Sequence, residues 1–168
     1  MLSNDDFALK SRRLSAKVAI LKPKNPTHVM TDTAPLVTSF DVRFCETDAL
    51  QHVSNTALVA WFEAAREPIF RMFTPELDLQ NWPLILASYK VDFLAQIFYG
   101  KPVTVKTYIS RLGNSAFDVF QELWQDEKLC STGITTMVHF DYKTQRSAPI
   151  PDDIKAELQS HFKTLETK

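Results

Sequence analysis

The sequence predicts an α+β fold in which an antiparallel sheet curls around one buried helix. The segment Thr56–Ala65 contains a single charged residue, Glu63. A surface helix needs only one apolar stripe, so a helix that is apolar on nearly every side must be covered by the rest of the chain. The segments that follow resemble strands and are joined by short links. Because a parallel crossover needs about a dozen residues, these strands are expected to run antiparallel.

Segments rich in β-branched and aromatic residues predict the strands of this sheet. The first strand is expected over Leu36–Cys45, where Phe40, Val42 and Phe44 recur at every second position and would face the core. The later strands are expected at Leu84–Phe93, Val103–Leu112, Phe117–Gln125 and Leu129–Tyr142, with turns at Gly113-Asn114 and Asp126-Glu127.

Capping residues and prolines predict where the helices begin and end. Ser54 or Asn55 is suited to cap the buried helix, because either side chain accepts a hydrogen bond from a free N–H. Pro68 predicts a kink or an end near Arg66, and residues 75–83 are expected to form a loop with room for a short helical turn. A last helix is expected to open at Pro151, with Ile154, Leu158 and Phe162 as its apolar stripe.

Composition narrows the class of protein. The chain has 168 residues, 45% hydrophobic and 23% charged, and a net charge of −1, which argues against nucleic acid as the main partner. No apolar run approaches the length of a membrane span, and Asp5 and Asp6 stand where a signal peptide would be basic. Cys45 and Cys130 form no paired motif. We therefore expect a cytoplasmic protein that is not associated with membranes.

Residues 1–35 differ from the rest of the chain. They contain six basic and three acidic residues, and Leu14, Val18 and Leu21 repeat at helical spacing before Pro23 and Pro26. We expect a basic N-terminal extension (1–35) followed by a single domain (36–168). The extension is expected to pack on its own domain or on a partner subunit; binding of nucleic acid or of an acidic partner is the alternative.

A polar loop precedes the buried helix and carries the candidate chemistry. It contains Glu46, Thr47, Asp48, Gln51, His52, Ser54 and Asn55. The first N–H groups of a helix are unpaired and carry partial positive charge. Such a helix end can hold an oxyanion or a polarised carbonyl next to the loop's acid, imidazole and amide groups.

The residues of this loop and helix resemble those of a known family. Thr47-Asp48-x-x-x-His52-Val53-x-Asn55, followed by Trp61-Phe62-Glu63-x-x-Arg66, is similar to the hot-dog-fold acyl-thioesterases of the 4-hydroxybenzoyl-CoA thioesterase type, and the resemblance extends over roughly residues 37–154. The chain departs from that family at Gln51, where glycine is usual, at Leu58, where tyrosine is frequent, and at Ser54, where asparagine is usual.

The resemblance implies a hot-dog fold, with the sheet wrapped around the central helix, and a homodimer or tetramer whose active sites lie at a subunit seam. It also implies an enzyme that cleaves an acyl-CoA or acyl-carrier-protein thioester to a free acid and a thiol. The alternative is a non-catalytic hot-dog module, blocked by Gln51, that binds an acyl ligand or a protein partner.

Roles for the candidate residues follow from the resemblance and from their chemistry. Asp48 is expected to act as nucleophile or general base; its alternative role is to stabilise the loop. His52 either supports catalysis or only holds the loop, and Asn55 is expected to offer its backbone N–H to the carbonyl. The residues expected to contact substrate are Val53, Ser54 and Trp61.

Several other residues are weaker candidates for the chemistry. Glu63 is a second carboxylate, but an ion pair with Arg66 is the expected use, and Cys45 as a nucleophile is disfavoured. No metal-ligand spacing or glycine-rich phosphate loop is present, so neither a metal nor a cofactor is expected. The residues that could contact a carrier's phosphates are Lys90, Lys101, Lys106 and Arg111, and the sequence leaves CoA and acyl-carrier protein both open.

Overall fold

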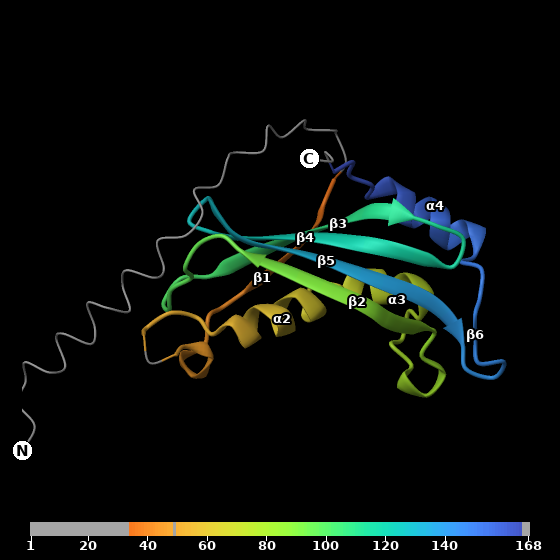
Figure 1. Ribbon diagram of the computed structural model, residues 1–168, viewed down its shortest axis with the longest axis horizontal. Coiled ribbons are helices and arrows are strands. Elements are labelled where there is room, and N and C mark those ends of the chain that lie inside the picture. Colours follow the sequence, from red (N-terminus) through yellow and green to blue (C-terminus); the bar gives the residue numbers. More distant parts are fainter. Residues whose placement is uncertain (1–33, 49, 166–168) are drawn as a thin grey trace, which may run out of the picture.

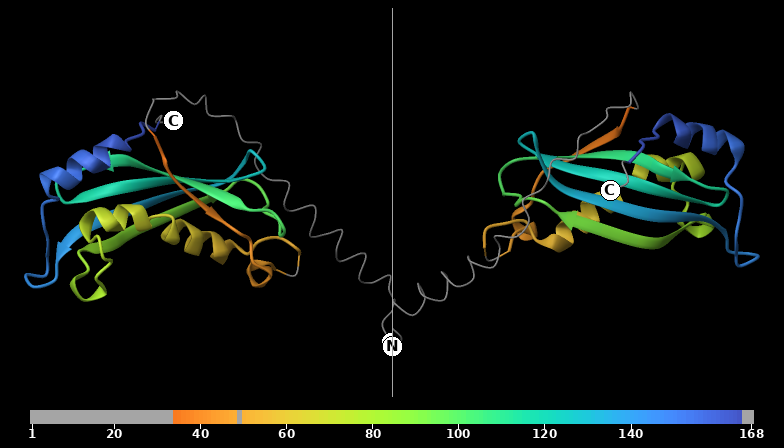
Figure 2. Two further views of the ribbon diagram at one scale, coloured as in Figure 1. Left: turned by 180° about the vertical axis from the view of Figure 1, so that it is seen from behind. Right: turned by 45° about the horizontal axis from the view of Figure 1, so that its top comes forward.

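The described part of the chain is a curved antiparallel sheet with the central helix and the helix after it in its hollow and the C-terminal helix beside one of its strands (Figure 1 and Figure 2). The computed structural model describes residues 34–48 and 50–165, so the expected extension lies almost wholly outside the described residues. The strands are β1 (Leu36–Phe40), β2 (Leu84–Phe93), β3 (Val103–Leu112), β4 (Ala116–Gln125), β5 (Lys128–Asp141) and β6 (Arg146–Ser147). Their order is β1-β3-β4-β5-β2, with β6 paired to β5 (Figure 1). This arrangement confirms the expected hot-dog architecture.

Helix α2 (Asn55–Ala64) is the central helix that the apolar run predicts. Leu58, Trp61 and Phe62 are buried against the sheet. Gly133 of β5 allows this close approach, because a Cβ atom there would lie 3.3 Å from the Phe62 ring. Figure 2 shows α2 and α3 (Glu67–Phe73) on the concave side of the sheet.

The expectation that α2 is covered on every side is wrong for a single chain. Val59 is 40% exposed, and Ala60, Glu63 and Ala64 are also exposed. A single curved sheet can enclose only part of a helix, so one side of α2 stays open to solvent. Val59, Ala60 and Ala64 give this open side an apolar strip beside Glu63.

The predicted break at Pro68 is confirmed. Helix α2 ends at Ala64, and α3 starts at Glu67 with Pro68 in its first turn. Proline lacks an N–H and is well tolerated at this position, whereas it would interrupt a continuous helix. Within the predicted loop 75–83, Leu79–Asn81 forms the short helical turn η2.

The first strand ends earlier than the alternating pattern predicts. It stops at Phe40, and Phe44–Glu46 forms the 3-10 turn η1. Val42 is buried, but Phe44 is 77% exposed, so the two side chains do not share a face. The Glu46 carboxylate accepts a hydrogen bond from the Arg43 N–H at 2.7 Å, which closes the chain into a turn.

The later strands lie where the sequence predicts them, but their order in space differs from their order in the chain. Strand β2 pairs with β5 at one edge of the sheet, and β3 lies three positions away. Residues 94–102 cross from one to the other. The β4–β5 turn forms at Asp126 and Glu127, both with positive φ (49° and 60°), as a two-residue hairpin requires.

The C-terminal segment pairs with β3 at a position just beyond the part of β3 that pairs with β1. Helix α4 (Asp152–Ser160) follows Pro151 and buries Leu158, as predicted. Phe162 then lies parallel to β3 at Ile109, where the Lys163 N–H donates to the Ile109 carbonyl at 2.8 Å. Within the described ranges, no helix has the length and apolarity needed to cross a membrane.

Candidate active site

Asp48 organises the loop between η1 and α2. Its Oδ1 atom accepts hydrogen bonds from the Leu50 N–H at 2.7 Å and the His52 N–H at 3.2 Å. The Asp48 N–H in turn donates to the His52 carbonyl at 2.8 Å. Among the described residues, Oδ2 has no hydrogen-bond partner, and the Asp48 side chain is exposed. One carboxylate oxygen therefore fixes the loop while the other faces solvent.

Glu46 ties this loop to α2. Its side chain is 8% exposed and accepts hydrogen bonds from the Arg43 guanidinium at 2.7 Å and the Trp61 indole N–H at 3.1 Å. Burial alone would raise the pKa of Glu46, but the hydrogen bonds from Arg43 and Trp61 lower it below its ordinary value. Glu46 therefore stays ionised and acts as a structural anchor, because its oxygens are already occupied.

Replacing Glu46 should destabilise the fold without touching the solvent-facing oxygen of Asp48. In Glu46→Gln the amide places a donor beside the N–H groups of Arg43 and Trp61, so hydrogen bonds are lost. We expect the free energy of unfolding to fall by about 1–3 kcal/mol, measured by urea denaturation at pH 7. A loss smaller than that of an exposed Glu76→Gln control would contradict the anchoring role.

The Glu46 carboxylate also makes the stability of the unsubstituted protein, the parent, depend on pH. Because the folded-state pKa of Glu46 lies below its ordinary value near 4.5, its stabilisation is complete above that value and is lost as the pH falls through the folded-state pKa. We expect the difference in free energy of unfolding between the parent and Glu46→Gln to disappear as the pH is lowered from about 5 to about 3. A stability difference that is unchanged over this range would exclude the ionised form as the stabilising species.

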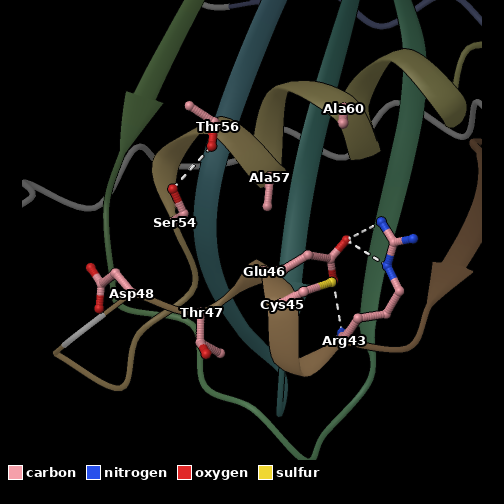
Figure 3. Close-up of a pocket in the computed structure, with 9 residues that line it drawn as sticks. All are labelled: Arg43, Cys45, Glu46, Thr47, Asp48, Ser54, Thr56, Ala57 and Ala60. Atoms are coloured by element: carbon pink, nitrogen blue, oxygen red, sulfur yellow. Dashed lines mark hydrogen bonds and ion pairs between the residues drawn. The ribbon is translucent and has the colours of Figure 1, made fainter.

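Two pockets meet at Asp48. The first, the helix pocket, has a volume of about 340 Å³ and is lined by Arg43, Cys45, Glu46, Thr47, Asp48, Ser54, Thr56, Ala57 and Ala60 (Figure 3). The second, the aromatic pocket, has a volume of about 470 Å³ and is lined by Phe44, Thr47, Asp48, Gln51, Phe98 and Tyr99. Thr47 and Asp48 are common to both, so the carboxylate stands at their boundary.

The helix pocket reaches the amino-terminal end of α2. Ser54 is the N-cap residue, but its hydroxyl bonds to the Thr56 hydroxyl at 3.0 Å and not to a backbone N–H. The first N–H groups of the helix are therefore not satisfied by a capping side chain. An oxyanion placed in this pocket would meet their partial positive charge.

The aromatic pocket has a wall that is held in place by the sheet. The buried Gln125 amide bonds both backbone groups of Phe98, accepting from its N–H and donating to its carbonyl, each at 2.9 Å. The Phe44 and Tyr99 rings meet edge to face with centroids 5.9 Å apart. All three rings are about half exposed or more. The pocket thus offers apolar surface close to Asp48.

Comparison with known proteins identifies the class of this site. A family model described as the thioesterase-like superfamily matches residues 42–158, which include the loop, α2 and the whole sheet except β1. The chain belongs to the thioesterase-like superfamily. This membership supports acyl-thioester hydrolysis as its general activity.

Two solved structures similar to this thioesterase-like chain are described as thioesterases. A predicted thioesterase from Bacillus stearothermophilus is 38% identical, covering 79% of this chain and 100% of that one, with a TM-score of 0.76. A thioesterase from Thermus thermophilus, complexed with coenzyme A and Zn, is 25% identical, covering 77% and 96% of the two chains, with a TM-score of 0.68. The uncharacterized protein YsmA of Bacillus subtilis is 25% identical over 119 residues, which is 70% of this chain and 80% of YsmA.

The residues expected to form the thioesterase site fall into two groups. Asp48 and Ser54 line the pockets, and the His52 ring packs edge to face on Phe98, with centroids 5.4 Å apart. Val53 and Trp61 are buried in the core and line neither pocket, and Asn55 is an exposed first residue of α2. The backbone N–H and carbonyl of His52 both bond to Asp48.

The other residues considered for catalysis lie in different surroundings. Cys45 lines the helix pocket, whereas Glu63 is exposed and lines neither pocket. The expected ion pair between Glu63 and Arg66 is not formed. Arg66 is 2% exposed, and its Nη1 donates to Gln121 Oε1 at 3.3 Å and Thr135 Oγ1 at 3.2 Å. Arg66 lies at the break between α2 and α3, and its guanidinium is buried against the sheet, where this burial lowers its pKa.

The basic residues considered for carrier phosphates interact with neighbouring side chains. Lys90, Lys101 and Arg111 form ion pairs with Asp92, Asp126 and Asp118, and Lys106 lies 5.0 Å from the centroid of the Trp124 ring. Within the described part of the chain, no group of three or more histidine, cysteine or acidic residues is arranged to hold a metal ion.

The pattern of the sequence misses part of this site. Arg43 and Glu46 are not distinguished from other strand and loop charges until the turn at Phe44–Glu46 is known. Phe98 and Tyr99 lie about fifty residues beyond the loop and join it through pairing of His52 with Phe98. The only signal in the sequence is an apolar triplet, Ile97-Phe98-Tyr99, between two predicted strands.

Proposed function

We propose that this chain hydrolyses acyl-CoA thioesters, with Asp48 as the general base or nucleophile. The observation that carries the proposal is the position of the Asp48 carboxylate, at the boundary of two pockets and near the amino-terminal end of α2. Its Oδ1 atom is held by the Leu50 and His52 N–H groups, which fixes the direction of Oδ2. A preorganised carboxylate next to a helix dipole fits the needs of acyl transfer.

The proposed reaction follows from this geometry. The thioester carbonyl lies in the helix pocket, and its oxygen takes up negative charge against the N–H groups at Asn55 and Thr56. Acting as a base, Asp48 removes a proton from water, whose oxygen attacks the carbonyl carbon. The C–S bond then breaks, and the thiolate leaves and takes up that proton. Acting as a nucleophile, Asp48 would form an acyl anhydride that water then hydrolyses to the same products.

The carrier and the assembly are part of the proposal. The CoA complex of the Thermus thermophilus relative favours CoA over acyl-carrier protein. The open apolar side of α2 at Val59, Ala60 and Ala64 favours a homo-oligomer that covers it. The molecular mass in solution tests this point, and a fully active monomer at micromolar concentration would contradict it.

A panel of acyl-CoAs tests the activity. Release of free CoA is followed with a thiol reagent, using short and long aliphatic and aromatic acyl groups. We expect kcat/KM of about 10⁴ M⁻¹s⁻¹ or more for at least one class. The second candidate, a binding module, would instead bind non-hydrolysable S-alkyl-CoA without turnover of any thioester. The feature that favours the binding module is Gln51, which lines the aromatic pocket.

A further inference from the structure

Gln51 holds a backbone conformation that its side chain makes unfavourable. Its φ angle is +66°, in the left-handed region where glycine is the residue without strain. Other non-glycine residues of the described chain share this feature, namely Leu77, Asp126, Glu127 and Gln145. Of these, only Gln51 lines either pocket. A strained residue at a pocket wall calls for a functional explanation.

The surroundings of Gln51 indicate what that function is. The aromatic pocket is walled by Phe44, Phe98 and Tyr99, and its polar lining consists of Thr47, Asp48 and Gln51. The Asp48 carboxylate and the Thr47 hydroxyl have other uses: Asp48 Oδ1 holds the loop, and Thr47 Oγ1 donates to the Phe44 carbonyl at 2.7 Å. Gln51 is exposed, and among the described residues its backbone N–H bonds to the Asp48 carbonyl while its side-chain amide bonds to no other group.

We propose that the aromatic pocket receives the acyl group and that Gln51 is a specificity-determining residue, whose amide binds a polar atom on an otherwise apolar acyl chain. The inference rests on the proposed function, because it assumes that the thioester lies at Asp48. An amide both donates and accepts, so it selects acyl groups that carry a hydroxyl or carbonyl oxygen over analogues that lack one.

The test compares two substitutions that relieve the same strain. Gln51→Gly removes the amide from the pocket, and Gln145→Gly removes an exposed glutamine with φ +56° in the β5–β6 turn, away from both pockets. Each substitution relieves backbone strain, but Gln145→Gly also removes the hydrogen bond from its side-chain amide to the Tyr142 carbonyl at 2.7 Å. The thermal midpoint of Gln145→Gly is therefore expected to lie at or below that of Gln51→Gly, and only Gln51→Gly should alter selectivity.

Selectivity is measured on matched acyl-CoA pairs. The pairs are octanoyl with 8-hydroxyoctanoyl, and 3-phenylpropanoyl with 3-(4-hydroxyphenyl)propanoyl. In at least one pair the parent and Gln145→Gly should prefer the hydroxylated member by about fivefold to tenfold in kcat/KM, the usual effect of one hydrogen bond. In Gln51→Gly this ratio should fall to about one. If Gln51→Gly leaves this ratio unchanged, the inference is overturned. It is also overturned if Gln51→Gly raises kcat/KM equally for both members of each pair, because Gln51 would then act only as a steric barrier.

Binding separates this inference from the proposed hydrolysis. Dissociation constants of the matching non-hydrolysable S-alkyl-CoA pairs are measured by calorimetry for the same three proteins. If the parent hydrolyses no thioester but Gln51→Gly still abolishes the preference for the hydroxylated ligand, the proposed function fails and the inference stands. If hydrolysis is normal and the preference is the same in all three proteins, the inference fails and the proposed function stands.

Discussion

Asp48→Asn is expected to lower kcat by about a hundredfold or more, the usual effect of losing a positioned acid–base group. Asparagine keeps an oxygen that can accept the Leu50 and His52 N–H bonds, so the loop should hold its shape. It cannot take a proton from water or attack a carbonyl carbon. KM should change little, because the carboxylate contributes mainly in the transition state.

Asp141→Asn is the matched control for this substitution. Asp141 is a half-buried carboxylate that also holds a turn, accepting from the Lys143 N–H at 2.8 Å and the Thr144 hydroxyl at 2.9 Å. It lines neither pocket, so its replacement should leave kcat unchanged. If Asp48→Asn keeps near-normal hydrolysis while Glu63→Gln abolishes it, the helix carboxylate is the catalyst. His52→Ala should cost less than Asp48→Asn, because its backbone and not its ring bonds to the Asp48 turn.

Phe62→Ala should produce the largest loss of stability. The Phe62 ring is 0% exposed and lies against Gly133 at the centre of the sheet. Removing it leaves a cavity between α2 and β5, and we expect the free energy of unfolding to fall by about 3–5 kcal/mol. Urea denaturation followed by circular dichroism measures this change.

Phe44→Ala controls for the loss of a phenylalanine. Phe44 is 77% exposed at the rim of the aromatic pocket, so its truncation should cost less than about 1 kcal/mol. Equal losses for the two variants would mean that α2 does not pack as the central helix. Phe44→Ala should instead affect KM for acyl groups that use the aromatic pocket.

Local patterns in the sequence determined most of the secondary structure. The end of α2 before Pro68 and the bounds of β2 and β3 agree with the predictions, because proline geometry and side-chain alternation act over a few neighbouring residues. The start of α2 at Asn55 also agrees, although the Ser54 side chain does not make the capping hydrogen bond expected of it. The resemblance of the loop and helix residues to a known thioesterase family, and not these patterns, singled out Asp48 as the candidate carboxylate. Its hydrogen bonds to Leu50 and His52 are also local.

Contacts between residues distant in the sequence decided the rest. The turn that follows β1 is held to α2 by the bond of Glu46 to Trp61, fifteen residues further along the chain, which no alternation of apolar residues encodes. The position of β2 beside β5 depends on which edges pair in space. The aromatic pocket exists only because the sheet brings Phe98 to the loop, where Gln125 fixes its backbone. The sequence therefore determined where the carboxylate lies, whereas the tertiary structure decided which pockets it faces, because pocket walls are built from segments that meet only when the chain is folded.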